Sequence, residues 1–361
     1  MDPKKLSGLT TDGAPAMVGK HKGFCKNFLE TFGSQEAALN HCIIHQENLC
    51  SKVLDNINIM KEVVPCINYI RNRGLNHRQF KFFLEELDTD YPDISYFSSV
   101  RWLSRADTLK RFWSLRNEIK SFMESKNQDV AFLSDVEWLN DLAFLTDVTQ
   151  HLSKLNKQLQ GRNQLANAMF EHITSFQKKL KLFKGQLSIP VLTHFPCLKS
   201  QREEGKDINY LKYSTMTDKL AAAFDDRFQD FRTLECDFGI FSNPFQVVAD
   251  QCRDQFQLEL IDLQCSSNLK RAFEENDLVT FYKNYVREQY PNLAKHALKM
   301  TSLFGSTYCC EQFFSKMKQC KGKQRGQLTD EHLKNQLRIA CSTTKINIVE
   351  ALKNVQHQKS H

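Results

Sequence analysis

Apolar residues recur every three or four positions through most of the chain, from about residue 56 to residue 290, and this period constrains the fold more than any other feature. It is the period of one face of an α-helix, so three long amphipathic helices are predicted. Their apolar stripes are Trp102, Ala106, Leu109, Trp113, Ile119 and Met123; Phe132, Val136, Leu139, Leu142, Leu152, Leu155 and Leu159; and Leu165, Met169, Ile173, Phe176, Leu180 and Phe183. Residues 56–274 are therefore predicted to be a helical domain.

Residues 1–55 have a different pattern. The opening KKLSGLTTDGAPAMVG predicts a short strand that ends at Thr11 and Asp12, then a turn, then a helix from Phe24 to Phe32. The run ALNHCIIHQENLC is short and partly β-branched, which indicates a buried strand passing into a helix. This order of strand, helix, strand and helix is an α/β fragment that is too small to close a sheet by itself.

Residues 275–361 form the third predicted region, and its stretch GSTYCCEQFFSKMKQCKGKQRG turns abruptly from apolar to cationic. A helix there would place four residues on one stripe that we expect to be buried: Cys310, Phe313, Phe314 and Met317. Glu311 lies at the edge of this stripe. A carboxylate in that position could bind a metal, pair with the following lysines, or mark the end of the buried face.

A terminal amphipathic helix is predicted in LTDEHLKNQLRIACS, beginning at Thr329. Its inward-facing residues are expected to be Leu333, Leu337 and either Ile339 or Ala340. A helix of this kind often docks on its own chain or on a second copy.

Basic residues are concentrated near the carboxyl end. The whole chain has 49 basic and 42 acidic residues, a net charge of +7. Nine basic and three acidic residues lie between Lys295 and Arg338. Such a field attracts DNA phosphates through counterion release, although a solvated face is the commoner explanation. The candidate DNA-binding residues of this segment are Lys316, Lys318, Lys321, Lys323 and Arg325.

The remaining composition excludes several classes of protein. The twelve cysteines are scattered without a C-x-x-C pair, which indicates reduced thiols rather than a disulfide framework. No apolar run is long enough to span a bilayer, and the amino terminus has no apolar segment of signal-peptide length. Secretion and membrane insertion are not expected.

Six strings carry a resemblance to a known family: LTTDGAPAMVG, HCIIHQENL, SSVRWLSR, FQLELIDLQC, YPNLAKHALKMTSLFGSTYCCEQFFSKMK and LTDEHLKNQLRIA. Together and in this order they resemble the hAT superfamily of DNA transposases. The likeness is greatest to its Buster-type, host-domesticated branch, which includes BED-finger proteins and the transposon-derived half of some transcription factor II-I repeat proteins. The resemblance covers the chain from near residue 6 to near residue 341.

The resemblance implies an α+β, mostly α fold: a ribonuclease H-like core, interrupted by a large helical insertion, with a C-terminal hAT dimerisation segment. Members of the family cut DNA with three acidic residues that hold two divalent metals for attack on a phosphodiester. By position, Asp12 matches the second of these acids and Glu311 matches the third. Read without the resemblance, Asp12 is a turn or cap residue.

Two further motifs match the family. Cys42 and His45 match its C-x-x-H, and a hydrogen-bonded core histidine is favoured over a zinc site because a second ligand pair is missing. Arg101 and Trp102 match its R-W pair, where the tryptophan is expected to stack near a DNA end or a flipped base. A plain core anchor is an equal alternative for Trp102, since it begins a regular apolar stripe.

The chain also departs from the family pattern. The first catalytic aspartate of the family lies well upstream of TTDGAPAM, and here eleven residues precede Asp12. A zinc-binding BED finger is not found either. We therefore expect an incomplete ribonuclease H-like core in a domesticated protein that is not an enzyme, with no cofactor and no resident metal; Mg²⁺ would be needed only by an active enzyme.

The expected function is a nuclear DNA-binding or protein-interaction module, with the cytoplasm as an alternative location. DNA and a second copy, or a related hAT-derived protein, are the expected partners, and a membrane is not. Two alternatives stay open. One is an active metal-dependent transposase or nuclease, and the other is a protein-interaction scaffold without DNA affinity.

Overall fold

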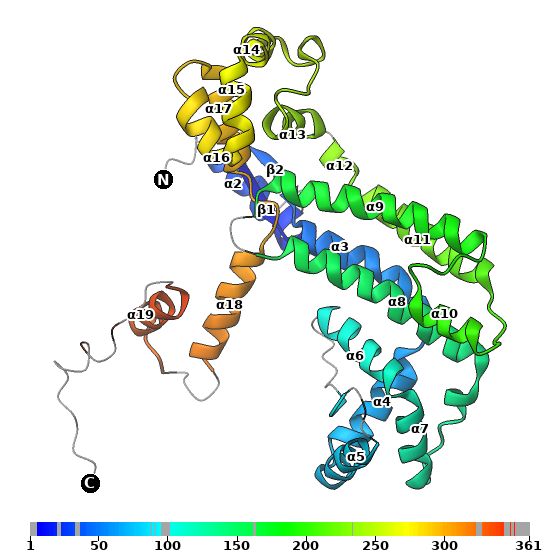
Figure 1. Cartoon of the computed structure of the whole chain (residues 1–361). Coiled ribbons are helices and arrows are strands. Elements are labelled where there is room, and N and C mark those ends of the chain that lie inside the picture. The colour runs from blue at the N-terminus through cyan, green and yellow to red at the C-terminus, as the bar shows by residue number, and fades with distance from the viewer. Residues whose placement is uncertain are drawn as a thin grey trace. The chain divides into compact units, whose positions relative to one another are not determined.

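The computed structural model describes residues 6–19, 23–32, 37–87, 89, 91–94, 102–161, 164–232, 234–322, 327–342, 347 and 350. The chain divides into two compact units, Met1–Ser306 and Thr307–His361 (Figure 1). Most of the described residues are helical, as the sequence predicts. The division into residues 1–55, 56–274 and 275–361 stays a prediction.

The first unit begins with a parallel pair of strands, β1 (Gly8–Thr11) and β2 (Ala38–His41). Gly8 pairs with Ala38 and Thr11 with His41, so the carboxyl ends of both strands lie at one edge. Along the chain, helices α1 (Pro15–Val18) and α2 (Phe24–Phe32) come between the two strands, and α3 (Ile43–Ser51) follows β2. The predicted order of strand, helix, strand and helix is confirmed. These strands are the whole sheet of the described residues, and a ribonuclease H-like core stays a prediction.

Helices make up the rest of the first unit. They are η2 (Lys52–Asn56), α4 (Met60–Arg71), α5 (Gly74–Glu86), α6 (Trp102–Ser114), α7 (Arg116–Ser125), η3 (Ala131–Ser134), α8 (Val136–Leu159), α9 (Ala166–Ser188), α10 (Pro196–Glu203), α11 (Tyr210–Arg227), α12 (Gln229–Arg232), α13 (Glu235–Ser242), η4 (Ala249–Gln251), α14 (Asp254–Cys265), α15 (Ser267–Glu275), α16 (Leu278–Phe281), the π-helical turn η5 (Tyr282–Val286) and α17 (Pro291–Thr301).

The first of the three long helices predicted from the sequence is in fact two helices, α6 and α7. They meet at Leu115, whose φ of −100° and ψ of 14° leave the helical range. Its side chain is buried, with 1% of its surface exposed. The six-residue step from Trp113 to Ile119 in the apolar pattern marks this break. The other two predicted helices correspond to η3 with α8, and to α9.

Helix α8 is the centre of the helical region. It packs against α3, α6, α9 and α10, while α11 packs on α9 and α3. Because α8 has neighbours on several sides, buried residues occur all around it, including Phe144, Leu145, Leu152 and the polar Asn156. Each fully buried Leu or Phe of this kind contributes about 1.5–3 kcal/mol.

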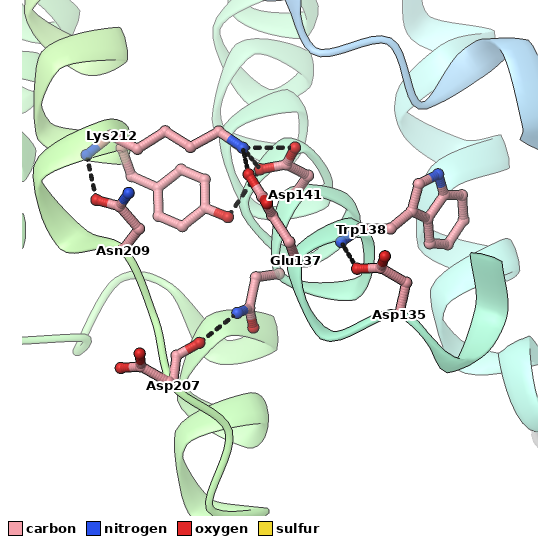
Figure 2. Close-up of polar contacts among 9 residues, drawn as sticks. Asp135, Glu137, Trp138, Asp141, Asp207, Asn209 and Lys212 are labelled. Carbon is pink, nitrogen blue, oxygen red and sulfur yellow. Dashed lines mark hydrogen bonds and ion pairs between the residues drawn. The ribbon is translucent and has the colours of Figure 1, made fainter.

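A polar cluster joins the amino-terminal parts of α8 and α11 (Figure 2). The ammonium of Lys212 lies 2.9 Å from Glu137 Oε1 and 2.7 Å from Asp141 Oδ1. The hydroxyl of Tyr213 donates to the same Asp141 oxygen over 2.8 Å. Burial and the charge of Asp141 raise the pKa of Tyr213, so the phenol stays protonated. The cluster links the two helices through ion pairs and a hydrogen bond.

The second unit consists of α18 (Tyr308–Cys320) and α19 (Asp330–Cys341), which pack on each other. Thr329 caps α19 by accepting from the His332 N–H over 3.3 Å, at the predicted start. Leu333 and Leu337 are buried as predicted, whereas Ile339 is 62% exposed and Ala340 is exposed. The prediction that Ile339 or Ala340 faces inward was wrong.

The predicted stripe on α18 is not buried either. The helix forms, but none of its residues is buried, and Phe313 and Phe314 are 42% and 54% exposed. The physical reason is size, because a pair of short helices has too little surface to cover a whole stripe.

Candidate functional site

We call Asp12, Gly13, His41, Cys42 and His45 the strand-end site, because they lie at or just after the carboxyl ends of β1 and β2. Asp12 is exposed, and its Oδ1 accepts a hydrogen bond from the Ala14 N–H over 3.0 Å, as in an Asx turn. Gly13 has a φ of +73°, which favours glycine. A Cβ at Gly13 would lie 2.2 Å from His41 Cε1. The turn after β1 therefore packs directly on the His41 ring.

The two histidines of the site stack on each other, with ring centroids 5.3 Å apart. Burial is the main cause that lowers the pKa of His41, and the neighbouring His45 and Arg227 lower it further, against a hydrogen bond with the Asp12 backbone. His41 is therefore neutral near pH 7. Its Nε2 is buried and finds no hydrogen-bond partner among the described residues.

Cys42 joins the two strands. Its side chain is fully buried, and its N–H donates to the Thr11 carbonyl over 2.8 Å. All twelve cysteines of the chain are thiols and not disulfides. Within the described ranges, no group of three or more His, Cys, Asp or Glu side chains is arranged to hold a metal ion. The side chains of the strand-end site therefore do not form a metal site by themselves.

The segment before the second unit is fixed beside this site. The Ile43 N–H at the start of α3 donates to the Gly305 carbonyl over 2.9 Å, and the Thr10 hydroxyl donates to the Phe304 carbonyl. A Cβ at Gly305 would lie 2.7 Å from Met169 Sδ, on α9. Phe304 and Gly305 thus lie close to three elements: β1, α3 and α9.

Glu311 belongs to the second unit, whereas Asp12 belongs to the first. Glu311 is exposed in the first turn of α18, where its Oε1 accepts a hydrogen bond from the Thr307 hydroxyl over 2.9 Å. An acidic side chain is favourable there because of the helix dipole. This side-chain contact with Thr307 is not one of the three alternatives predicted for Glu311, and its predicted catalytic role stays a prediction.

The predicted DNA-binding residues are distributed as follows. Lys316 and Lys318 are exposed on α18, and Lys321 follows that helix with its Nζ 3.9 Å from Asp330 Oδ1. This exposed ion pair contributes little to the stability of the fold. Trp102 begins α6, but its side chain falls outside the described residues. Three predicted residues lie wholly outside them: Arg101, Lys323 and Arg325.

Two buried acids were missed by the sequence analysis. Glu47 on α3 is fully buried, and burial raises its pKa to about 8. Asp147 on α8 accepts the N–H groups of Cys197 and Leu198 at 3.0–3.1 Å, and burial raises its pKa to about 7. The sequence HQENLC holds one indication that Glu47 is buried: the helix there has no clear polar face that could be turned to solvent.

Part of the chain that forms this site is similar in sequence to known proteins. Residues 41–188, which span the strand-end histidines through α9, match a family model. It is the FAM200/GTF2IRD2 helical domain. The match begins at His41, so it includes Cys42, His45 and Trp102, while Asp12 and Glu311 lie outside it.

Longer similarity extends over nearly the whole chain. It is 38% identical over 346 residues to the general transcription factor II-I repeat domain-containing protein 2 of Bos taurus, covering 94% of this chain and 36% of that protein. The Mus musculus protein of the same name is 38% identical over 326 residues, covering 89% of this chain and 34% of that protein. This chain therefore spans about a third of the length of these relatives.

No solved structure gives a significant match. Across the part of the chain that the structure describes, no helix combines the length and the apolar character needed to cross a membrane.

Proposed function

We propose that this chain is a domesticated hAT transposase-like protein whose second unit binds DNA in the nucleus without cutting it. The six family-like strings in order support the transposase ancestry. The parallel strand pair with Asp12 at its carboxyl edge supports descent from a ribonuclease H-like core. The transcription-factor name of the similar mammalian proteins supports a nuclear location.

The observation that carries the DNA-binding proposal is the surface of α18. Lys316 and Lys318 are exposed beside the exposed rings of Phe313 and Phe314. Lysines contact phosphates without regard to sequence, and aromatic rings stack on unpaired bases. A basic helix with uncovered aromatic rings is therefore suited to weak, sequence-tolerant binding of DNA.

DNA cleavage is not expected because the carboxylates of Asp12 and Glu311 make other contacts. Two-metal phosphoryl transfer needs several carboxylates that clamp both ions. The Asp12 carboxylate supports its own turn through Ala14, and the Glu311 carboxylate accepts from Thr307. Each of these two carboxylates thus already holds a local contact, so Asp12 and Glu311 are interpreted as remnants of a site.

The proposal is tested by fluorescence anisotropy with labelled duplex and single-stranded oligonucleotides at low salt. The full chain should bind both. A variant with five basic residues changed to Gln should lose the binding: Lys316, Lys318, Lys321, Lys323 and Arg325. Unchanged affinity in this variant would contradict the proposal and favour a scaffold without DNA affinity.

A matched control removes the same charge elsewhere. It changes to Gln five exposed lysines from five separate elements of the first unit: Lys61, Lys157, Lys219, Lys270 and Lys283. Both variants lower the net charge by five, so a non-specific charge effect weakens both equally. The proposal requires that the control keep most of the wild-type affinity.

Self-association through the second unit is a second candidate, favoured by the exposed Phe313, Phe314 and Ile339. Burial of these side chains against a second copy would stabilise a dimer. Sedimentation velocity of the Phe313→Ser/Phe314→Ser variant tests it. A dimer that persists unchanged in this variant would contradict it.

A further inference from the structure

A surface groove runs along α9 on the side of α13. It is made of two adjoining hollows of about 630 and 560 Å³ that share Asn167, Glu171, Ser242 and Asn243. Asn167 Nδ2 donates to Ser242 Oγ over 2.7 Å, and the ring centroids of Phe170 and Phe238 lie 5.7 Å apart. Helix α13 therefore forms a wall along the amino-terminal half of α9.

The residues of α9 that line the groove lie on one helical face. Their spacing follows the helical period over four turns: Asn167, Phe170, Glu171, Thr174, Ser175, Lys178, Lys179 and Leu182. Leu182 is 50% exposed, and the two lysines and Glu171 are exposed. The rest of the first unit thus leaves this face of α9 uncovered.

The face is self-complementary about a point between Thr174 and Ser175. Glu171 and Lys178 lie at equal distances on either side of this point along the sequence, and so do Phe170 and Lys179. In an antiparallel contact between two copies of α9, a two-fold axis at this point would place each residue opposite its counterpart.

This arrangement gives favourable contacts in pairs. Two carboxylate–ammonium pairs, Glu171 with Lys178 of the other copy, would form across the axis. Two Lys179 ammonium groups would face Phe170 rings, which attract cations. The small side chains of Thr174 and Ser175 at the crossing point would let the helices approach closely.

We propose that α9 of a second copy of this chain occupies the groove, antiparallel to α9 of the first. By the symmetry of the contact, α13 of each copy flanks one half of the helix pair. This interface lies in the first unit. It is separate from the basic surface of α18 and does not depend on DNA binding.

Sedimentation velocity of the full chain at about 1–100 µM, a range that covers weak dimers, tests the proposal. The wild type should show a concentration-dependent dimer. Glu171→Lys and Lys178→Glu should each weaken it by about tenfold, because two attractive pairs become two repulsive ones. The double variant Glu171→Lys/Lys178→Glu should restore the dimer, since both pairs are regained with reversed signs.

Lys181→Glu is the control, because Lys181 lies on α9 and is exposed but does not line the groove. It makes the same charge change as Lys178→Glu and should leave the dimer unchanged. The rescue also separates a lost contact from misfolding, since the double variant carries both substitutions.

Three results would overturn the proposal. They are a wild-type monomer at 100 µM, single reversals that behave like the control, and a double variant that stays as weak as the single ones. A dimer that is lost on changing Phe313 and Phe314 to Ser, but not on charge reversal, would place the contact on the second unit instead.

Discussion

Asn156 on α8 donates a hydrogen bond from Nδ2 to Glu47 Oε2 on α3 over 2.6 Å, inside the core. The other oxygen of Glu47 is buried and finds no hydrogen-bond partner among the described residues. Burial raises the pKa of Glu47 from 4.5 to about 8, so the folded protein holds this acid mostly protonated at pH 7. The helical core is thus joined by a neutral acid–amide pair.

This pair predicts a pH-dependent stability. The folded pKa of Glu47 is higher than the unfolded value of 4.5, so the native state keeps a proton that the unfolded state releases. As the pH rises from 4.5 to about 8, the release of this proton on unfolding lowers the free energy of unfolding by about 1.4 kcal/mol per pH unit. Glu47→Gln, which cannot ionise, should therefore be more stable than the wild type at pH 7, by up to about 3 kcal/mol.

Urea unfolding of both proteins at several pH values from 5 to 8 measures this difference. The gain from Glu47→Gln should shrink toward zero as the pH falls to about 5. Glu30→Gln is the control, because Glu30 is an exposed residue with its side chain 65% accessible, and it should show almost no pH-dependent gain. A gain from Glu47→Gln that is the same at every pH would show that ionisation is not its cause.

The close packing of Gly13 on His41 predicts that a Gly13→Ala substitution lowers the stability of the fold more than the same substitution at an open glycine. Gly13 and Gly205 have φ values of +73° and +75°, but a Cβ meets the His41 ring only at Gly13, while Gly205 has nothing within 4 Å. Gly205→Ala should cost about 1–2 kcal/mol of backbone strain. Gly13→Ala should cost about 1–3 kcal/mol more because of overpacking. Equal losses for the two variants in urea unfolding would show that the turn does not press on His41.

Much of this fold follows from the pattern of apolar residues. Strand β1, helix α2 and the passage from β2 into α3 were predicted because the apolar period changes at these places. The break at Leu115 was missed because the six-residue step from Trp113 to Ile119 does not by itself distinguish a break from an irregular stripe within one helix, and the residue at the break is apolar and buried. The exposure of Phe313 and Phe314 was missed because a helical period shows which residues share a face but not whether another helix covers that face.

The strand-end site was predictable only in part. Asp12, Cys42 and His45 could be placed after strands from their motifs, but the stacking of His41 on His45 and the contact of Gly13 depend on the register of two strands distant in sequence. Glu47 could not be recognised as a neutral buried acid, because its protonation depends on α8 and α11 enclosing α3. The catalytic interpretation of Asp12 and Glu311 rests on resemblance, and it stays a prediction.

Catalytic inactivity is predicted because the two acids that match the family, Asp12 and Glu311, each hold a local contact, with Ala14 and Thr307 respectively. The isolated chain, incubated with Mg²⁺ or Mn²⁺ and a transposon-end duplex, should show no cleavage or strand transfer on a denaturing gel. Misplacement of reacting groups by about 1 Å can already cost on the order of a hundredfold in rate. Cutting that disappears in both Asp12→Ala and Glu311→Ala would show that an unidentified acid completes the site.

Salt dependence of DNA binding tests the central claim most directly. Each phosphate contact releases counterions, so the logarithm of the binding constant falls linearly with the logarithm of the salt concentration, with a slope of about −0.9 per contact on duplex DNA. If the five basic residues from Lys316 to Arg325 each contact a phosphate, the wild type should have a slope of about −4 to −5. The variant with all five changed to Gln should have a slope near zero, with little residual affinity. A wild-type slope that the five substitutions leave unchanged would show that the second unit is not the DNA-binding surface.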